Sequence, residues 1–182
     1  MKPTRTNAFA FAWGLAEATL FFIVPDVLLS WLALHGYKQA LVACLYALSG
    51  ALLGGVMIWL LGQVDAEAGR ALLAAIPGID DVLIADVRSQ LENAGLISLV
   101  QGPLSGTPYK IYALESGSLN YGLAIFVLVS IPARLVRFVV VAVVVGMLGR
   151  LLAPLLSLGQ RRVLLAVCWI GFYSWYFHMM SN

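Results

Sequence analysis

The sequence predicts an all-α integral membrane protein, folded as one small helical bundle over residues 1–182. Of the 182 residues, 62% are hydrophobic and 11% are charged, whereas soluble domains carry about 25% charged residues. Three apolar stretches, at 39–63, 120–149 and 163–180, are long enough for a transmembrane helix, which needs roughly 17–25 residues. We therefore expect three full transmembrane helices within a single membrane domain.

Two further apolar stretches, at 8–35 and 94–117, are interrupted in their middle. Pro25 and the aspartate after it break the first, because proline removes a backbone donor and an aspartate facing lipid is costly. Gly106 and Pro108 lie in the run QGPLSGTPYK, which breaks the second. Non-helical backbone is tolerated at membrane depth only where protein or water covers it. Both stretches are therefore predicted to be re-entrant hairpins.

The first stretch could also be read as a secretory signal peptide. It contains Glu17 and Asp26, however, and has no A-x-A-like cleavage site. We expect it to belong to the mature structure.

The charges between the apolar stretches predict an orientation. Basic residues flank the first stretch and follow the fourth, namely Lys2, Arg5, Lys38, Arg150, Arg161 and Arg162. The loop at 64–93 is acidic instead. Because cytoplasmic loops are enriched in Lys and Arg, we expect the N-terminus in the cytoplasm, and that loop and the C-terminus outside. The two hairpins then enter from opposite faces and meet near the midplane, as is typical of substrate sites in secondary transporters.

Two patterns predict packing rather than chemistry. Residues 80–93 have apolar side chains near helical spacing, which indicates an amphipathic helix lying on the bilayer surface. Gly50, Gly54 and Gly55 have the small-residue spacing that lets helices approach closely in membranes. We expect these glycines to pack the second stretch against a hairpin.

The C-terminal stretch carries a run of aromatic residues that predicts an interfacial belt. Cys44 and Cys168 lie in apolar runs, so we expect both to be buried, and their spacing indicates neither a disulfide nor a zinc site. No nucleophile elbow, H-E-x-x-H or Walker loop is present. We expect no metal, no cofactor and no enzymatic activity, and the net charge of +2 gives no reason to expect nucleic acid binding.

Six ionisable residues lie inside the apolar stretches and sum to zero charge: Glu17, Asp26, Lys110, Glu115, Arg134 and Arg137. An unpaired charge at the bilayer centre costs between about 2.5 and more than 10 kcal/mol. We therefore expect these side chains to converge on one another or on a water-filled cavity, and to mark a transport pathway.

Residue type and spacing suggest separate roles for the basic and acidic members. Arg134 and Arg137, three residues apart, share a helix face and with Lys110 could clamp a phosphate. Glu17 and Asp26, on either side of the first break, could exchange protons as an anionic substrate arrives or leaves.

Structural alternatives remain open for these residues. The arginines could be only countercharges for Glu17 and Asp26, and Asp26 could instead cap the backbone amides that the break frees. Glu115, near the outer end of its stretch, could simply reach the membrane interface.

The chain resembles the DedA superfamily, also called the VTT or SNARE-associated Golgi family, and particularly its short YqaA-like branch. The resemblance covers about 13–149, with 163–180 as an additional C-terminal helix. Four segments carry it in the same order: 17–29 (EATLFFIVPDVLL), 49–55 (SGALLGG), 107–110 with 116–117 (TPYK and SG), and 130–138 (SIPARLVRF).

The resemblance implies opposed re-entrant hairpins inside a small bundle of a bacterial inner membrane protein. By position, Glu17 and Asp26 match the essential acidic residues of the family, Arg134 and Arg137 match its basic pair, and Lys110 matches the lysine of the second hairpin. Gly117 matches a small residue after that lysine, where we expect it to shape the hairpin.

The expected function is translocation of an anionic lipid phosphate, such as undecaprenyl phosphate, coupled to protons. The partners would be membrane lipids and protons, with a homo-oligomer possible. Two other classes stay open. One is a proton-coupled antiporter for small cations or drugs, and the other is a non-transporting membrane assembly protein.

Overall fold

The computed structural model describes residues 3–180, which form helices and turns with no β-strand among them. The helices are α1 (Pro3–Thr19), α2 (Asp26–Ala33), α3 (Tyr37–Val64), α4 (Ala66–Ala74), α5 (Asp81–Ala94), a 3-10 turn η1 (Gly95–Ile97), α6 (Ser98–Ser105), α7 (Tyr109–Ser118), α8 (Leu123–Leu151) and α9 (Leu158–Met180). The all-α prediction is confirmed. α1 and α9 begin about five residues earlier than predicted, because polar residues extend each helix beyond its apolar part.

Two helices, α3 with 28 residues and α8 with 29, are long and apolar enough to cross a membrane. α9 does not join them over its described side chains, which run to His178. Arg161 and Arg162 lie near its start and lower its hydropathy. Length and composition therefore identify two of the three predicted spans.

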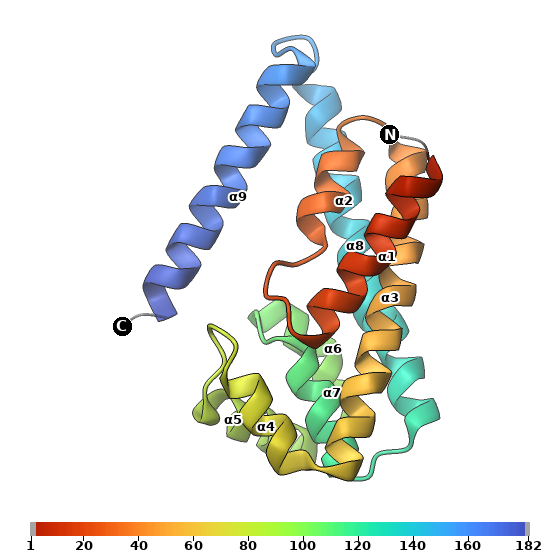
Figure 1. Cartoon of the computed structure of the whole chain (residues 1–182). Helices are drawn as coiled ribbons and strands as arrows, with labels where there is room; N and C mark the ends of the chain where they lie inside the picture. The colour runs from red at the N-terminus through yellow and green to blue at the C-terminus, as the bar shows by residue number, and fades with distance from the viewer. Residues whose placement is uncertain (1–2, 181–182) are drawn as a thin grey trace.

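The first interrupted stretch folds as a helical hairpin, α1–α2, here called the first hairpin (Figure 1). α1 ends at Thr19, residues 20–25 turn the chain, and α2 begins directly after Pro25. Proline suits this position because the first amide groups of a helix have no partner inside it. The turn lies beside the middle of α3, and both arms run toward the end of the bundle where the N-terminus lies.

The second interrupted stretch folds as another helical hairpin, α6–α7, here called the second hairpin. Gly106 ends α6 with φ 82°, a left-handed conformation that glycine adopts without a steric penalty. Pro108 is extended, with ψ 128°, and precedes the first residue of α7. Figure 1 shows this hairpin at the opposite end of α3 from the first. The two breaks predicted from the sequence are therefore both present.

Both hairpins pack against α3, whose glycines permit the close approach. A Cβ atom at Gly50 would lie 2.0 Å from a carbonyl oxygen of α1. Gly54 lies against Ala18 near the end of α1, and the next residue, Gly55, lies against the Tyr109 ring at the start of α7. The tips of the two hairpins therefore meet beside adjacent glycines in the middle of α3.

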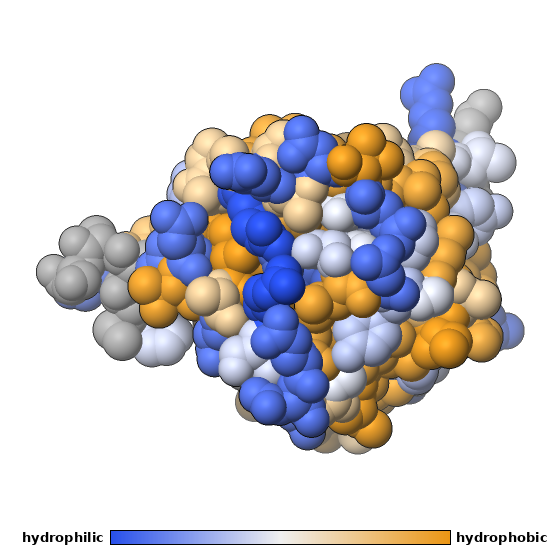
Figure 2. All heavy atoms as spheres, turned by 90° about the horizontal axis from the view of Figure 1, so that it is seen from below, coloured by the Kyte–Doolittle hydropathy of each residue, from blue (hydrophilic) through white to orange (hydrophobic). Residues whose placement is uncertain are grey.

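The helices α4 and α5 close the end of the bundle where α3 terminates. α5 matches the predicted amphipathic helix, but its apolar side is not free to lie on a bilayer. Ile84, Val87 and Leu91 are buried in one core cluster with residues of α7, while Val82 is 76% exposed. Figure 2 views this end and shows hydrophilic residues running across the face, with hydrophobic residues around its edge. α4 was not predicted.

Candidate functional site

Five of the six predicted ionisable residues come together where the hairpin tips meet α8. Glu17 lies near the end of α1, and Asp26 is the first residue of α2. Lys110 is the second residue of α7, and Arg134 and Arg137 lie in the middle of α8. Ion pairs and hydrogen bonds join these elements, so residues more than 100 positions apart in the chain form one cluster.

The innermost pair is Glu17 with Arg134. Both guanidinium NH groups donate to the two carboxylate oxygens, and the side chains are 6% and 1% exposed. The guanidinium carbon of Arg134 also lies 4.7 Å from the centre of the Tyr109 ring and 5.0 Å from that of Phe138, within cation–π range. Arg134 is therefore enclosed, and its fork is already engaged.

The second pair is Asp26 with Arg137, which is more accessible. The Asp26 side chain is 2% exposed and the Arg137 side chain is 28% exposed. Among the described residues, Oδ1 of Asp26 is buried without a hydrogen-bond partner. An ionised carboxylate oxygen is an acceptor with capacity to spare. This oxygen can therefore take up a proton or a donor from a ligand.

Lys110 carries the remaining charge of the cluster. Its residue is 2% exposed, and Nζ donates to the carbonyl oxygen of Phe21, 2.8 Å away, in the turn of the first hairpin. Within residues 3–180 no carboxylate lies at ion-pair distance from this ammonium. Two acids and three bases therefore leave one surplus positive charge at the meeting point of the hairpins.

Side chains also bond backbone groups that the first break leaves without helical partners. Trp13 Nε1 donates to the carbonyl oxygen of Ile23 at 2.9 Å, and the Val24 amide donates to the Tyr173 hydroxyl at 3.0 Å. Next to the second break, two side chains bond each other, because the Tyr109 hydroxyl donates to Ser130 Oγ on α8 at 3.0 Å. Covered backbone of this kind is the condition for irregular structure at membrane depth.

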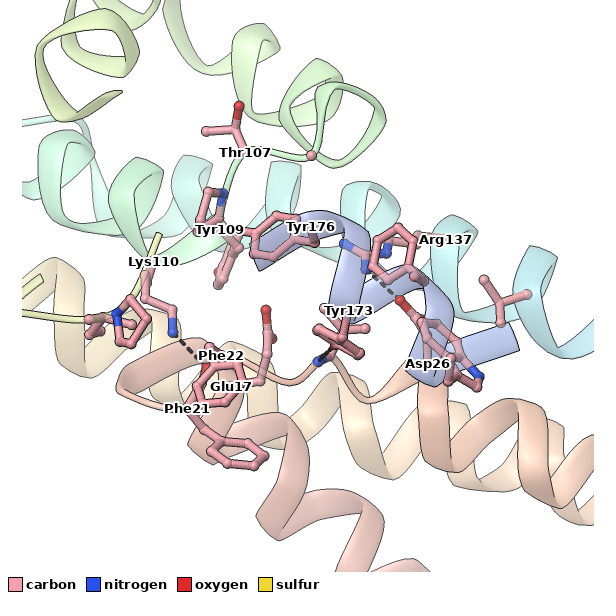
Figure 3. Close-up of a pocket in the computed structure, with 18 of the residues that line it drawn as sticks. Glu17, Phe21, Phe22, Asp26, Thr107, Tyr109, Lys110, Arg137, Tyr173 and Tyr176 are labelled. Atoms are coloured by element: carbon pink, nitrogen blue, oxygen red, sulfur yellow. Dashed lines mark hydrogen bonds and ion pairs between the residues drawn. The ribbon is translucent and has the colours of Figure 1, made fainter. Parts of the chain in front are cut away.

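A cavity of about 830 Å³ lies between the hairpin tips, α8 and α9. Figure 3 shows Lys110 beside Glu17 and Phe21, and Arg137 beside Asp26, along this space. The cavity is lined by Glu17, Asp26, Lys110 and Arg137, whereas Arg134 does not line it. Arg137 and Lys110, but not Arg134, are therefore placed to meet a ligand, and the enclosed position of Arg134 favours the countercharge alternative for that residue.

α9 supplies a wall of the cavity that sequence reasoning did not anticipate. Five aromatic residues predicted to form an interfacial belt line the cavity: Trp169, Phe172, Tyr173, Trp175 and Tyr176. Cys168 also lines it and is exposed, so the prediction that both cysteines are buried is wrong for Cys168 and confirmed for Cys44. An aromatic run near the end of an apolar helix does not indicate which other element its rings face. Only the fold shows that these rings face the cavity.

Glu115 does not join the cluster, and it does not reach the surface of the protein. It is fully buried, and Arg70 and Arg88 bind it from α4 and α5, with N–O distances of 2.7 Å and 3.1 Å. Lys110 and Glu115 are five residues apart on α7, which places them about 7.5 Å apart along the helix axis. The hydrogen bonds with Glu115 raise the pKa of Arg70 above its ordinary value. This second ionic cluster fastens α4 and α5 to the second hairpin.

We predict an asymmetric stability effect at this second cluster. The double variant Arg70→Gln with Arg88→Gln leaves a fully buried carboxylate unpaired and should lower the free energy of unfolding by about 3–5 kcal/mol. Glu115→Gln should lower it by only about 1–3 kcal/mol, because the arginine side chains are 33% and 39% exposed and can turn to water. Unfolding in detergent measures both.

The matched control is Glu92→Gln, which removes an exposed partner of Arg88. That carboxylate is 50% exposed, so a change within about 0.5 kcal/mol is expected. If Glu115→Gln lowers the free energy of unfolding more than the double variant does, the buried charge of Glu115 is not what the two arginines stabilise.

Comparison with known proteins gives one relative and no family. The chain is 25% identical over 140 residues to an uncharacterized protein of Haemophilus influenzae, covering 75% of this chain and 72% of the relative. No protein-family model matches the chain. No solved structure matches it either. The similarity covers about three quarters of each chain and carries no functional assignment.

Proposed function

We propose that the chain is an integral membrane protein of the DedA type, in which α3, α8 and α9 cross a bacterial inner membrane. The first and second hairpins would re-enter the membrane from opposite faces, with the N-terminus in the cytoplasm and α4–α5 and the C-terminus outside. The meeting of the hairpin tips in the middle of α3 supports this arrangement. So does the hydrophilic band across the α4–α5 end of the bundle.

The protein would carry an anionic lipid phosphate, such as undecaprenyl phosphate, between the two leaflets. The observation that carries this proposal is the surplus positive charge of Lys110 in a cavity that Arg137 also lines. The Lys110 ammonium and the fork of Arg137 are suited to phosphate oxygens, and apolar and aromatic side chains around them are suited to a lipid tail.

Protons would be exchanged at the two acidic residues. When a phosphate engages Arg137, Asp26 loses part of its countercharge, and neutralising that carboxylate by protonation becomes favourable. The unpartnered Oδ1 of Asp26 is the atom available to accept the proton. Glu17 lines the same cavity, and its protonation would likewise become more favourable when Lys110 holds a phosphate.

A second candidate is an antiporter for hydrophobic cations. The aromatic lining of the cavity favours it, because ring faces attract cations, and the free oxygen of Asp26 would supply the charge. Charge removal separates the two candidates. A cation site should tolerate Arg137→Gln better than Asp26→Asn, whereas an anion site should lose more activity with Arg137→Gln.

The direct test is flipping of a fluorescent lipid phosphate in proteoliposomes by the wild type and by Arg137→Ala. We expect the variant to flip at no more than about a tenth of the wild-type rate, since a hydrogen bond to a charged group contributes about 1.5–3 kcal/mol. Arg150→Ala is the matched control, because Arg150 lies on the same helix but outside the cavity. Equal rates for the wild type and Arg137→Ala would overturn the mechanism.

A further inference from the structure

α9 differs from the other long helices in how it is held. None of its described side chains is fully buried, whereas α3 and α8 each contribute many residues to the core. Figure 1 shows α9 standing to one side of the bundle and joined to it through the turn after α8. A helix without buried core residues has little packing to fix its position.

Besides a hydrogen bond from Arg161 to the Gly149 carbonyl oxygen of α8, several contacts of α9 are directed at the first hairpin. The Tyr173 hydroxyl accepts a hydrogen bond from the Val24 amide at 3.0 Å. Trp169 Nε1 donates to Ser30 Oγ, also at 3.0 Å, and the rings of Phe177 and Phe22 lie 5.4 Å apart. None of these contacts buries a described residue of α9 in the core.

Two of these contacts bracket Asp26 along the chain. Val24 precedes it by two residues, and Ser30 follows it by one helical turn. α9 therefore holds the turn that orients Asp26 and the first part of α2. Displacement of α9 would release the Val24 amide, and the backbone leading into Asp26 would lose its anchor.

We propose that α9 is a side gate of the cavity, and that Tyr173 couples its opening to the Asp26–Arg137 ion pair. α9 lines one flank of the cavity with its aromatic residues, so a ligand with a long apolar tail that enters across this flank has to displace α9. Opening would loosen the ion pair and free Arg137 for the headgroup. The identity of the transported ligand rests on the proposed function, whereas the motion of α9 does not.

The motion is tested by spin-label distances, which do not depend on what is transported. Labels would be placed at Ile170 on α9 and Leu53 on α3, both exposed, after replacing Cys44 and Cys168 by Ser. Tyr173→Phe should shift the distribution toward longer distances. Tyr176→Phe is the matched control, because the structure shows no hydrogen bond from that hydroxyl among the described residues, and it should leave the distribution unchanged. Identical distributions for the wild type and Tyr173→Phe would overturn the proposal.

A cross-link then tests whether the motion matters. Phe22→Cys with Phe177→Cys, in the same cysteine-free background, should lose at least tenfold in lipid flipping when oxidised and recover on reduction. Thr6→Cys with Gln39→Cys ties α1 to α3, which are not expected to separate, and should flip equally in both states. Full flipping by the oxidised gate pair would refute the gate. Absence of flipping in every sample, with the Tyr173→Phe distance shift present, would instead refute only the lipid assignment.

Discussion

Replacing Arg134 by Gln is expected to lower the free energy of unfolding by about 3–5 kcal/mol, the loss typical of breaking a buried ion pair. The reason is that Glu17 would be left as an unpaired carboxylate in a site where its side chain is only 6% exposed. The double variant Glu17→Gln with Arg134→Gln removes both charges and should recover most of that loss. Chemical or thermal unfolding of the purified protein in detergent measures it.

The outcome of the double variant separates charge from packing. If it is as unstable as Arg134→Gln alone, the guanidinium stabilises the fold mainly through the rings of Tyr109 and Phe138. Arg150→Gln serves as the control, because Arg150 is exposed and its loss should change stability by less than about 1 kcal/mol. A wild-type stability for Arg134→Gln would mean that Glu17 finds another partner.

The breaks and the central cluster were predictable because each follows from a local cost. Proline disrupts the hydrogen bonds of a helix, and Pro25 and Pro108 lie at the two turns, whereas Pro132 lies inside the continuous helix α8. An unpaired charge in an apolar segment is costly, so Glu17 and Asp26 were expected to converge on the basic residues of the other stretches.

The differences between chemically similar residues were not predictable in the same way. Arg134 and Arg137 are three residues apart on one helix, yet one is 1% exposed and the other 28%. That difference depends on Tyr109 and Phe138, which enclose only Arg134. Helical spacing specifies a face but not what covers it.

The partners of Glu115 were missed for a related reason. Arg70 and Arg88 lie in a loop whose net acidity suggested only an extramembrane location, and their value as countercharges depends on how α4 and α5 fold back onto α7. The aromatic residues of α9 present the same difficulty. Composition indicated a membrane interface, whereas the structure places five of those rings along the cavity.

Removing the charge of Lys110 is expected to abolish most transport without destabilising the protein. In Lys110→Gln a donor for the Phe21 carbonyl oxygen remains, while a buried ammonium that has no carboxylate at ion-pair distance in the described structure is lost. Burying an unpaired charge is unfavourable, so its removal should leave the melting temperature equal or raised. Lipid flipping should fall by about tenfold to a hundredfold, the equivalent of one charge-assisted hydrogen bond.

Lys110→Arg keeps the charge and is the control, expected to retain more flipping than Lys110→Gln. A parallel fall of the melting temperature and of flipping in Lys110→Gln would show that Lys110 is a structural link between the hairpin tips, and would contradict its role in holding phosphate. A stable but inactive Lys110→Gln would have the opposite meaning. A charge that the fold holds at a net loss of stability is retained for the ligand that neutralises it.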